Sequence, residues 1–104
     1  MDESRFDELG RAELAALEDA FEDVDPDEVE VSSSDGVLTL ELRDGVRIVI
    51  NTHRVARQIW MAAVASAWKF DHHADGRWRT AAGDELRATI AAVIRERLGI
   101  AVPL

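Results

Sequence analysis

The stretch GVLTLELRDGVRIVIN, residues 36–51, predicts two antiparallel strands joined by a tight turn. Apolar and polar residues alternate in both halves, so every second side chain points to the same face of a sheet. Asp44-Gly45 lies between the halves and is typical of two-residue hairpin turns. The predicted inward-facing residues are Leu38, Leu40, Leu42, Val46, Ile48 and Ile50.

Further strand signals flank this hairpin on both sides. Before it, Val29 and Val31 alternate with acidic residues, and Ser, Asp and Gly at 33–36 predict the turn into the hairpin. The remaining strands are expected at residues 57–64, 67–71 and 77–79, with a turn at 74–76 before the last.

A helix is predicted at each end of the chain. Residues 4–24 carry an apolar stripe with spacings of four and three, the period of one helix face. Ser4 can cap its start, and Pro26 favours an end before it, because the residue preceding a proline avoids helical geometry. The stripe is Phe6, Gly10, Leu14, Leu17, Phe21 and Val24.

The second helix is expected at residues 84–98, where Gly99 suits the position just after a helix end. Its stripe is Leu86, Ile90, Val93, Ile94 and Leu98. A run of strands between two helices predicts an α+β fold, a two-layer sandwich in which both helices cover one face of an antiparallel sheet. The 104 residues suit a single domain, residues 1–104.

The net charge of −9 is concentrated at the N-terminus. Residues 1–30 contain 13 acidic and two basic residues, whereas the rest of the chain has eight acidic and ten basic residues. Nucleic acid binding is disfavoured because it needs a basic surface, and cations or a basic protein surface are the expected partners.

Several other classes are excluded by composition. The chain has no cysteine, and hence no disulfide and no thiolate metal site. It has no apolar run of about 20 residues that would span a membrane and no signal-peptide pattern, so a cytoplasmic protein is expected.

The segment LEDAFEDVDPDEVEV, residues 17–31, holds eight carboxylates and no basic residue. On a helix continuing to residue 24, Glu18 and Glu22 would be like charges four apart, which destabilise a helix by about 0.2–0.5 kcal/mol. They would also oppose the helix dipole. We call the set the acidic ridge: Glu18, Asp19, Glu22, Asp23, Asp25, Asp27, Glu28 and Glu30.

The acidic ridge has two interpretations: a solvated face that keeps the protein soluble, or a binding surface. The local conflicts favour binding. Carboxylates suit hard cations such as Ca²⁺, Mg²⁺ and Mn²⁺, although residue chemistry does not single out iron. Without a calcium-loop spacing or a histidine in the ridge, weak binding of several ions is expected rather than a closed site.

A second candidate surface lies in the strand at 57–64. If Ile59 and Met61 face inward, Gln58 and Trp60 face outward. Trp60 is then either an exposed partner site or half-buried against neighbouring outer side chains such as Val49.

The segments GVLTLELRDGVRIVIN, RQIWMA, WKFD and GRW, in this order, resemble the frataxin family, in particular its bacterial, CyaY-type branch. The resemblance covers nearly the whole chain and includes the acidic first helix. It implies the same helix–sheet–helix sandwich and a protein of iron–sulfur cluster assembly.

The resemblance also implies that the acidic ridge binds Fe²⁺ or Fe³⁺ weakly and docks on a basic surface of a cysteine desulfurase. The positions that would contact the assembly of desulfurase and scaffold protein are Asn51, Gln58 and Trp60. The alternative is a metal-independent acidic adaptor or inhibitor that binds a basic protein surface.

An enzyme is not expected, since no catalytic triad, phosphate loop or set of two histidines and a carboxylate can be placed. His72 and His73 would point to opposite sides of a strand, which disfavours a shared metal and favours a surface position. Trp78 is expected in the core, with exposed Arg77 and Arg79 beside it.

Overall fold

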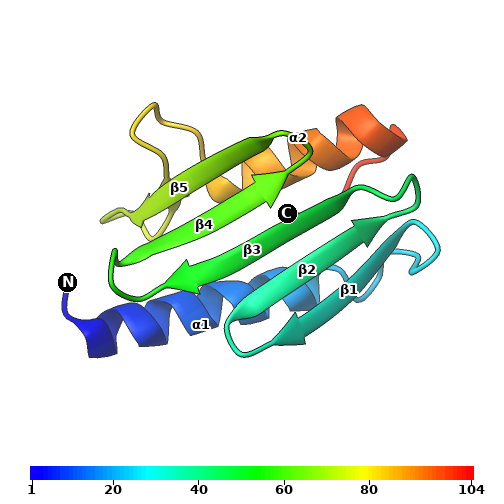
Figure 1. The fold of residues 1–104 in the computed structure, drawn as a ribbon. Helices are drawn as coiled ribbons and strands as arrows, with labels where there is room; N and C mark the ends of the chain where they lie inside the picture. Colours follow the sequence, from blue (N-terminus) through cyan, green and yellow to red (C-terminus); the bar gives the residue numbers. More distant parts are fainter.

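The computed structural model describes all residues, 1–104, and has two layers, a six-stranded sheet and a pair of helices (Figure 1). The strands are antiparallel and lie in chain order, and both helices cover the same face. This confirms the predicted α+β sandwich. The elements are α1 (Glu3–Ala20), β1 (Val29–Ser34), β2 (Val37–Leu42), β3 (Arg47–His53), β4 (Gln58–Ala63), β5 (Ser66–His72), β6 (Trp78–Arg79) and α2 (Leu86–Leu98).

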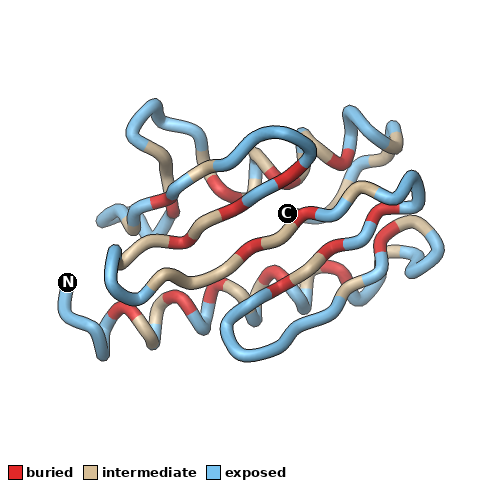
Figure 2. Tube along the Cα trace, in the orientation of Figure 1, coloured by how far each residue is buried: buried red, intermediate tan, exposed pale blue.

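The core lies between the sheet and the helices, and buried positions alternate along the strands as predicted (Figure 2). Of the six residues predicted to face inward from the central hairpin, five are buried and Val46 is half-buried. Trp78 is 2% exposed and joins the core, in contact with Phe6 edge to face at 6.0 Å between ring centroids. No helix is long and apolar enough to cross a membrane.

The loop at Asp44-Gly45 has three residues, not the predicted two. The Gly45 N–H donates to the Leu42 carbonyl, and the Leu42 N–H donates to the Val46 carbonyl, both at 2.8 Å. Gly45 has a φ of +90°. This is a turn followed by a glycine bulge. A true two-residue turn occurs at Asp35-Gly36, where both residues have positive φ.

The start of α1 differs from the prediction. The carboxylate of Asp2 accepts the N–H of Arg5 at 2.7 Å and caps the helix, so Ser4 already lies inside it. Both residues can cap a helix, and the more N-terminal one gains an extra half-turn here.

The end of α1 also differs, because the helix stops at Ala20, not at residue 24. The N–H groups of Phe21, Glu22 and Val24 each donate to the carbonyl three residues earlier, at 3.0–3.1 Å. Carboxylates are unfavourable at a helix C-terminus, and several acidic residues follow Ala20 in the sequence. Continuing the helix would therefore have placed more negative charge against its dipole.

A partly buried ion pair joins the two helices. Arg87 in α2 donates from Nε and Nη2 to the two carboxylate oxygens of Glu13 in α1, at 3.0 and 2.8 Å. The Glu13 side chain is 10% exposed, and its hydrogen bonds raise the pKa of Arg87. This bidentate geometry is the strong form of an arginine–carboxylate contact.

Helix α1 approaches the sheet closely at Thr52. A Cβ built on Gly10 would lie 2.9 Å from Thr52 Cγ2, and one built on Gly36 would lie 2.9 Å from Thr52 Oγ1. The Thr52 side chain therefore occupies space left by two glycines, one in the helix and one in a turn.

Candidate functional site

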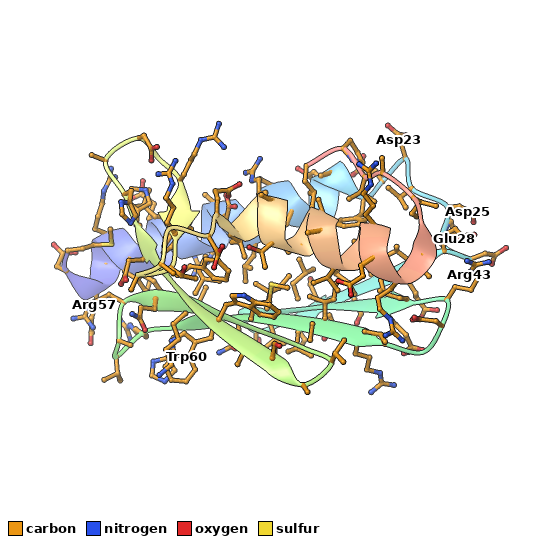
Figure 3. All side chains as sticks on the ribbon, turned by 90° about the horizontal axis from the view of Figure 1, so that it is seen from above. Asp23, Asp25, Glu28, Arg43, Arg57 and Trp60 are labelled. Carbon is orange, nitrogen blue, oxygen red and sulfur yellow. The ribbon has the colours of Figure 1, made fainter.

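The acidic ridge lies at one end of the molecule, where α1 passes into β1. Glu18 and Asp19 belong to the last turn of α1, and Glu22 and Asp23 lie in the turn after it. The others precede or begin β1; Figure 3 shows Asp23, Asp25 and Glu28 at this end. The structure thus brings the eight residues to one region, but on three local structures instead of one continuous helix face.

Only one member of the acidic ridge has a basic partner. Glu28 Oε2 lies 3.4 Å from Arg43 Nε, too poorly aligned for a hydrogen bond, and Oε2 has no other protein donor. Glu28 is half-buried, whereas the remaining seven residues of the ridge are exposed to solvent and form no ion pair. Asp25 accepts the N–H of Asp27 at 2.9 Å, which fixes the turn before β1.

No three carboxylates or histidines of the chain converge into a group that could hold a metal ion. The acidic ridge is instead a region of dense negative potential that raises the local concentration of cations. Such a surface can attract several ions loosely or orient a basic protein, in agreement with its open geometry.

The outer face of the sheet carries the second candidate surface. Ile59 and Met61 are 0% and 1% exposed, so Gln58 and Trp60 point away from the helices as predicted. Trp60 is half-buried and donates from Nε1 to Gln58 Oε1 at 2.9 Å. Gln58 in turn donates from Nε2 to Asp71 at 3.1 Å. The indole N–H is therefore satisfied within the protein, and the ring is held in one orientation.

Two further residues complete this surface and escaped the sequence analysis. His53 stacks on Trp60 with 3.8 Å between ring centroids, and Lys69 Nζ lies 4.8 Å from the indole centroid. Both face Trp60 because β3 and β5 flank β4 in register. The signal available beforehand was alternation, which places Lys69 outward on its own strand.

Asn51 lies directly opposite Trp60 in the β3–β4 register, as the resemblance requires for a common surface. Its Nδ2 makes only a long contact of 3.4 Å to the Thr52 carbonyl. Its amide therefore keeps hydrogen-bonding capacity for a partner.

The two candidate surfaces are well separated. In Figure 3, Trp60 projects from the outer face of the sheet near Arg57, at the opposite end of the molecule from Asp23, Asp25 and Glu28. A partner that contacts both must extend along much of the molecule, whose longest dimension is 38 Å.

The histidines of the last hairpin do not form a site. His72 is half-buried and packs edge to face on Trp78 at 5.0 Å, whereas His73 is exposed. Arg77 is exposed as predicted. Arg79 was also expected to be exposed, but it is half-buried and pairs with Asp75 at 2.8 Å.

The sequence and the fold are similar to those of known proteins. Residues 1–100 match the family described as the Frataxin-like domain. The chain belongs to the frataxin family. The family resemblance seen in the sequence is thereby confirmed, and membership supports the expectation that the protein is not an enzyme.

Curated relatives match at nearly full length. The iron–sulfur cluster assembly protein CyaY of Azotobacter vinelandii is 37% identical over 99 residues, covering 93% of this chain and 89% of the relative. The protein of the same name from Ralstonia pickettii is 35% identical over 109 residues, covering 100% and 95%.

Solved frataxin structures share the fold. The frataxin of Psychromonas ingrahamii superimposes with a TM-score of 0.90 at 24% identity, over 98% of this chain and 96% of that one. Trimeric yeast frataxin, from Saccharomyces cerevisiae and complexed with ferrous iron, gives a TM-score of 0.68 at 27% identity, over 96% and 88%.

Proposed function

We propose that the protein acts in iron–sulfur cluster assembly, where it binds Fe²⁺ or Fe³⁺ weakly on the acidic ridge and regulates a cysteine desulfurase by docking on it. The observation that carries the proposal is the ridge itself, in which only Glu28 has a basic partner. Membership of the frataxin family and the names of the relatives support the same role.

The unpaired negative charge supports both parts of the proposal, iron binding and docking on the desulfurase. Seven carboxylates without counter-charges create a field that concentrates cations and speeds the encounter with a basic protein surface. Iron bound there would have to be held loosely, because no group of three ligands is preformed.

The outer sheet face would supply the specific contacts to the desulfurase and scaffold protein. Trp60 is the anchor, held by Gln58 and His53, while Asn51 offers an amide with spare capacity. Large aromatic residues held in place are typical of the few positions that dominate binding energy.

Iron binding is tested by anaerobic titration of Fe²⁺ into ¹⁵N-labelled protein. The paramagnetic ion should broaden the amide signals of residues 18–30 selectively, and Glu22→Gln with Asp23→Asn should reduce the effect. Glu96→Gln serves as the matched control, because Glu96 is also exposed and unpaired but lies on α2. Uniform broadening of all amide signals, or broadening that is reduced by Glu96→Gln and not by the ridge variant, would contradict the ridge as the iron site.

A metal-independent adaptor or inhibitor is the second candidate, and the lack of a preformed metal group favours it. Here Glu22→Lys with Asp23→Lys should abolish binding to the purified desulfurase, whereas chelation of iron should leave binding unchanged. An affinity that changes with Fe²⁺ would exclude this candidate. An affinity insensitive to the double substitution would exclude docking through the ridge in either form.

A further inference from the structure

The sheet has an open edge at β5 that the last strand covers only in part. β6 contains two residues and pairs with Asp71 and His72, after which the chain turns away at Thr80. The segment from Ser66 to Phe70 therefore has a strand partner on the β4 side alone.

The hydrogen-bonding pattern identifies the unpaired backbone groups. His73 N–H donates to the Arg77 carbonyl at 2.8 Å, so His73 and Arg77 form a hydrogen-bonded pair across the β5–β6 hairpin. Such pairs alternate along an antiparallel ladder. The backbone groups of Ala67 and Lys69 thus point to the same side but meet no strand.

A groove lies beneath this open edge, between β5 and α2. Its volume is about 340 Å³. The half-buried Trp68 forms one wall, and the small residues Ala88 and Ala92 with Val93 form the other. Carboxylates occupy both ends, Asp84 before α2 and Glu96 in its last turn.

The charge at the ends of this groove is not compensated within the protein. Neither Asp84 nor Glu96 forms an ion pair. Glu85, beside Asp84, caps α2 and also lies 3.9 Å from Arg77. A second copy of this chain, with its own net charge of −9, is therefore an unfavourable occupant.

We propose that this edge binds an extended segment of a partner protein, which adds a strand beside β5 and carries basic side chains. Backbone hydrogen bonds to Ala67 and Lys69 would supply pairing, as in other cases of strand addition. The residue opposite Trp68 would face the groove and be apolar, and the residues two places before and after it would be Lys or Arg.

The dimensions fix the length of the segment. The eleven residue steps from Glu85 to Glu96 span roughly 16 Å at about 1.5 Å per residue. In an extended segment of five residues, the first and fifth are four steps apart, roughly 13 Å at about 3.3 Å per step, and the long side chains of Lys or Arg cover the remaining few ångströms. Alternation then turns the first, third and fifth side chains to the groove, which places the two basic ones near the carboxylates at its ends.

The probe is the peptide acetyl-Lys-Thr-Val-Thr-Lys-amide, titrated into the ¹⁵N-labelled full chain. The expected result is a set of shifts at Ala67, Trp68 and Lys69 and on the facing side of α2, with slowed amide exchange at Ala67 and Lys69. Two control peptides should bind much more weakly: one with Glu at both ends, and one with proline at the second and fourth positions, which lacks the two N–H donors of the ladder.

Substitutions in the protein separate this surface from the acidic ridge. Asp84→Lys with Glu96→Lys should weaken the affinity for the peptide about tenfold, since each exposed charge pair changes the affinity by a factor of a few. Asp23→Lys with Asp25→Lys changes the net charge equally and should leave the shifts at β5 in place. If the first double variant does not fold, Glu96→Lys alone should give about a threefold loss.

Three outcomes would overturn the proposal. The first is a peptide that shifts residues 18–34 instead of β5, which would place it on the ridge or the β1 edge. The second is equal binding of the proline peptide. The third is a concentration-dependent shift at Ala67 and Lys69 without peptide, which would identify a second copy as the occupant. None of the three outcomes argues against the proposed iron and desulfurase binding, and a peptide on the ridge would agree with docking there.

Discussion

Individual residues of this fold adopt backbone conformations that their side chains disfavour. Asp35, Arg57 and Val64 have positive φ, at 47°, 57° and 56°. Aspartate tolerates this region through local hydrogen bonding, but a β-branched residue does not. Val64 also has little packing to compensate, because it is 70% exposed in the tight turn between β4 and β5.

Val64→Gly should therefore stabilise the protein. Relief of the strained conformation is worth about 1–3 kcal/mol, and the greater freedom of glycine in the unfolded chain costs about 0.5–1 kcal/mol. Urea denaturation should show a net gain of about 1 kcal/mol. Val55→Gly is the matched control, since Val55 is 84% exposed and has negative φ, and it should destabilise. Equal effects of the two substitutions would argue against strain at Val64.

At the level of elements, α1 is positioned on the sheet by the fit of Thr52 between Gly10 and Gly36. A methyl group at position 10 would come closer to Thr52 Cγ2 than real Cβ atoms do. The helix would gain about 1 kcal/mol of intrinsic propensity from alanine, but the overpacked contact costs about 1–3 kcal/mol.

Gly10→Ala should accordingly destabilise by about 1 kcal/mol, because the close contact outweighs the gain in helix propensity. Thr52→Ser removes the methyl group that the new side chain would meet. In a double-mutant cycle, Gly10→Ala should then be neutral or stabilising in the Thr52→Ser background, as measured by chemical denaturation. An unchanged cost in that background would show that the helix is positioned by other contacts.

Two loops repeat one design, the three-residue connections at 43–45 and 74–76. In the first, Asp44 accepts the Val46 N–H at 3.1 Å and pairs with Arg97 of α2 at 2.7 Å. The Val46 hydrogen bond, followed by that of Arg97, lowers the pKa of Asp44. The pKa of Asp75 is lowered in the same way, first by the Arg77 N–H and then by Arg79.

A lowered folded-state pKa means that ionised Asp44 stabilises the protein above the ordinary aspartate pKa of about 3.9. This contribution is lost as the pH falls through the folded-state pKa. Asp44→Asn should thus be less stable than the wild type at pH 7, and the difference should shrink below about pH 4. Urea denaturation from pH 3 to 7 measures it, with Arg97→Ala as a background in which the difference should be smaller. A difference that is constant over this range would contradict the assignment.

Alternation was sufficient to predict the sheet, because a single buried face fixes which residues point inward, whereas Asp44-Gly45 predicted a loop that is one residue too short. The ends of α1 were not predictable, since Asp2 and Ser4 are both good caps and the carboxylates after Ala20 act through the helix dipole. Glu13 was also missed as a buried residue, although its spacing from Gly10 and Leu17 places it on the apolar stripe.

The acidic ridge was evident from composition, whereas the surroundings of Trp60 were not. His53 contacts the indole because β3 pairs with β4 in this register, and the loop at 54–57 that joins the two strands has Arg57 at positive φ. No residue type at that position signals such a conformation. The Trp60 ring is half-buried against His53 and Lys69, and its role as a partner site stays a prediction.

For the molecule as a whole, charge is distributed unevenly along the 38 Å axis. The acidic ridge concentrates unpaired carboxylates at one end, while most arginines elsewhere pair with acidic residues, such as Arg54 with Glu3 and Asp7 at 3.4 and 3.2 Å. Repulsion within the ridge opposes folding and is screened within about 10 Å at 0.1 M salt.

Added salt should therefore raise the melting temperature by a few degrees, with Mn²⁺ effective at lower concentration than Na⁺. Relief of about 1 kcal/mol corresponds to about 4–8 °C in a domain of this size. Glu22→Gln with Asp23→Asn should melt higher at low salt and respond less to added salt. A melting temperature that is unaffected by salt and Mn²⁺ would show that the ridge carries no repulsive strain.

The pairing of Glu13 with Arg87 joins residues 74 positions apart. Glu13→Ala should cost about 1–3 kcal/mol, because Arg87 loses two hydrogen bonds to a charged partner. Glu8→Ala is the control, since Glu8 is exposed and its one ion pair, with Arg5, is a surface contact at 3.7 Å. This substitution should change the free energy of unfolding by less than about 0.5 kcal/mol. Equal losses would show that the ion pair contributes no more than a surface contact.

The same pair bears on how the chain folds. Strands that neighbour each other in the sheet are also neighbours in sequence, so the hairpins close short loops, whereas α1 and α2 must meet from opposite ends of the chain. Contacts of long sequence separation that form after the rate-limiting step affect the unfolding rate and not the refolding rate. Stopped-flow measurements on Glu13→Ala should then show faster unfolding with refolding unchanged. The rate of folding would be governed by the hairpins, and the lifetime of the folded molecule by the contact between its two ends.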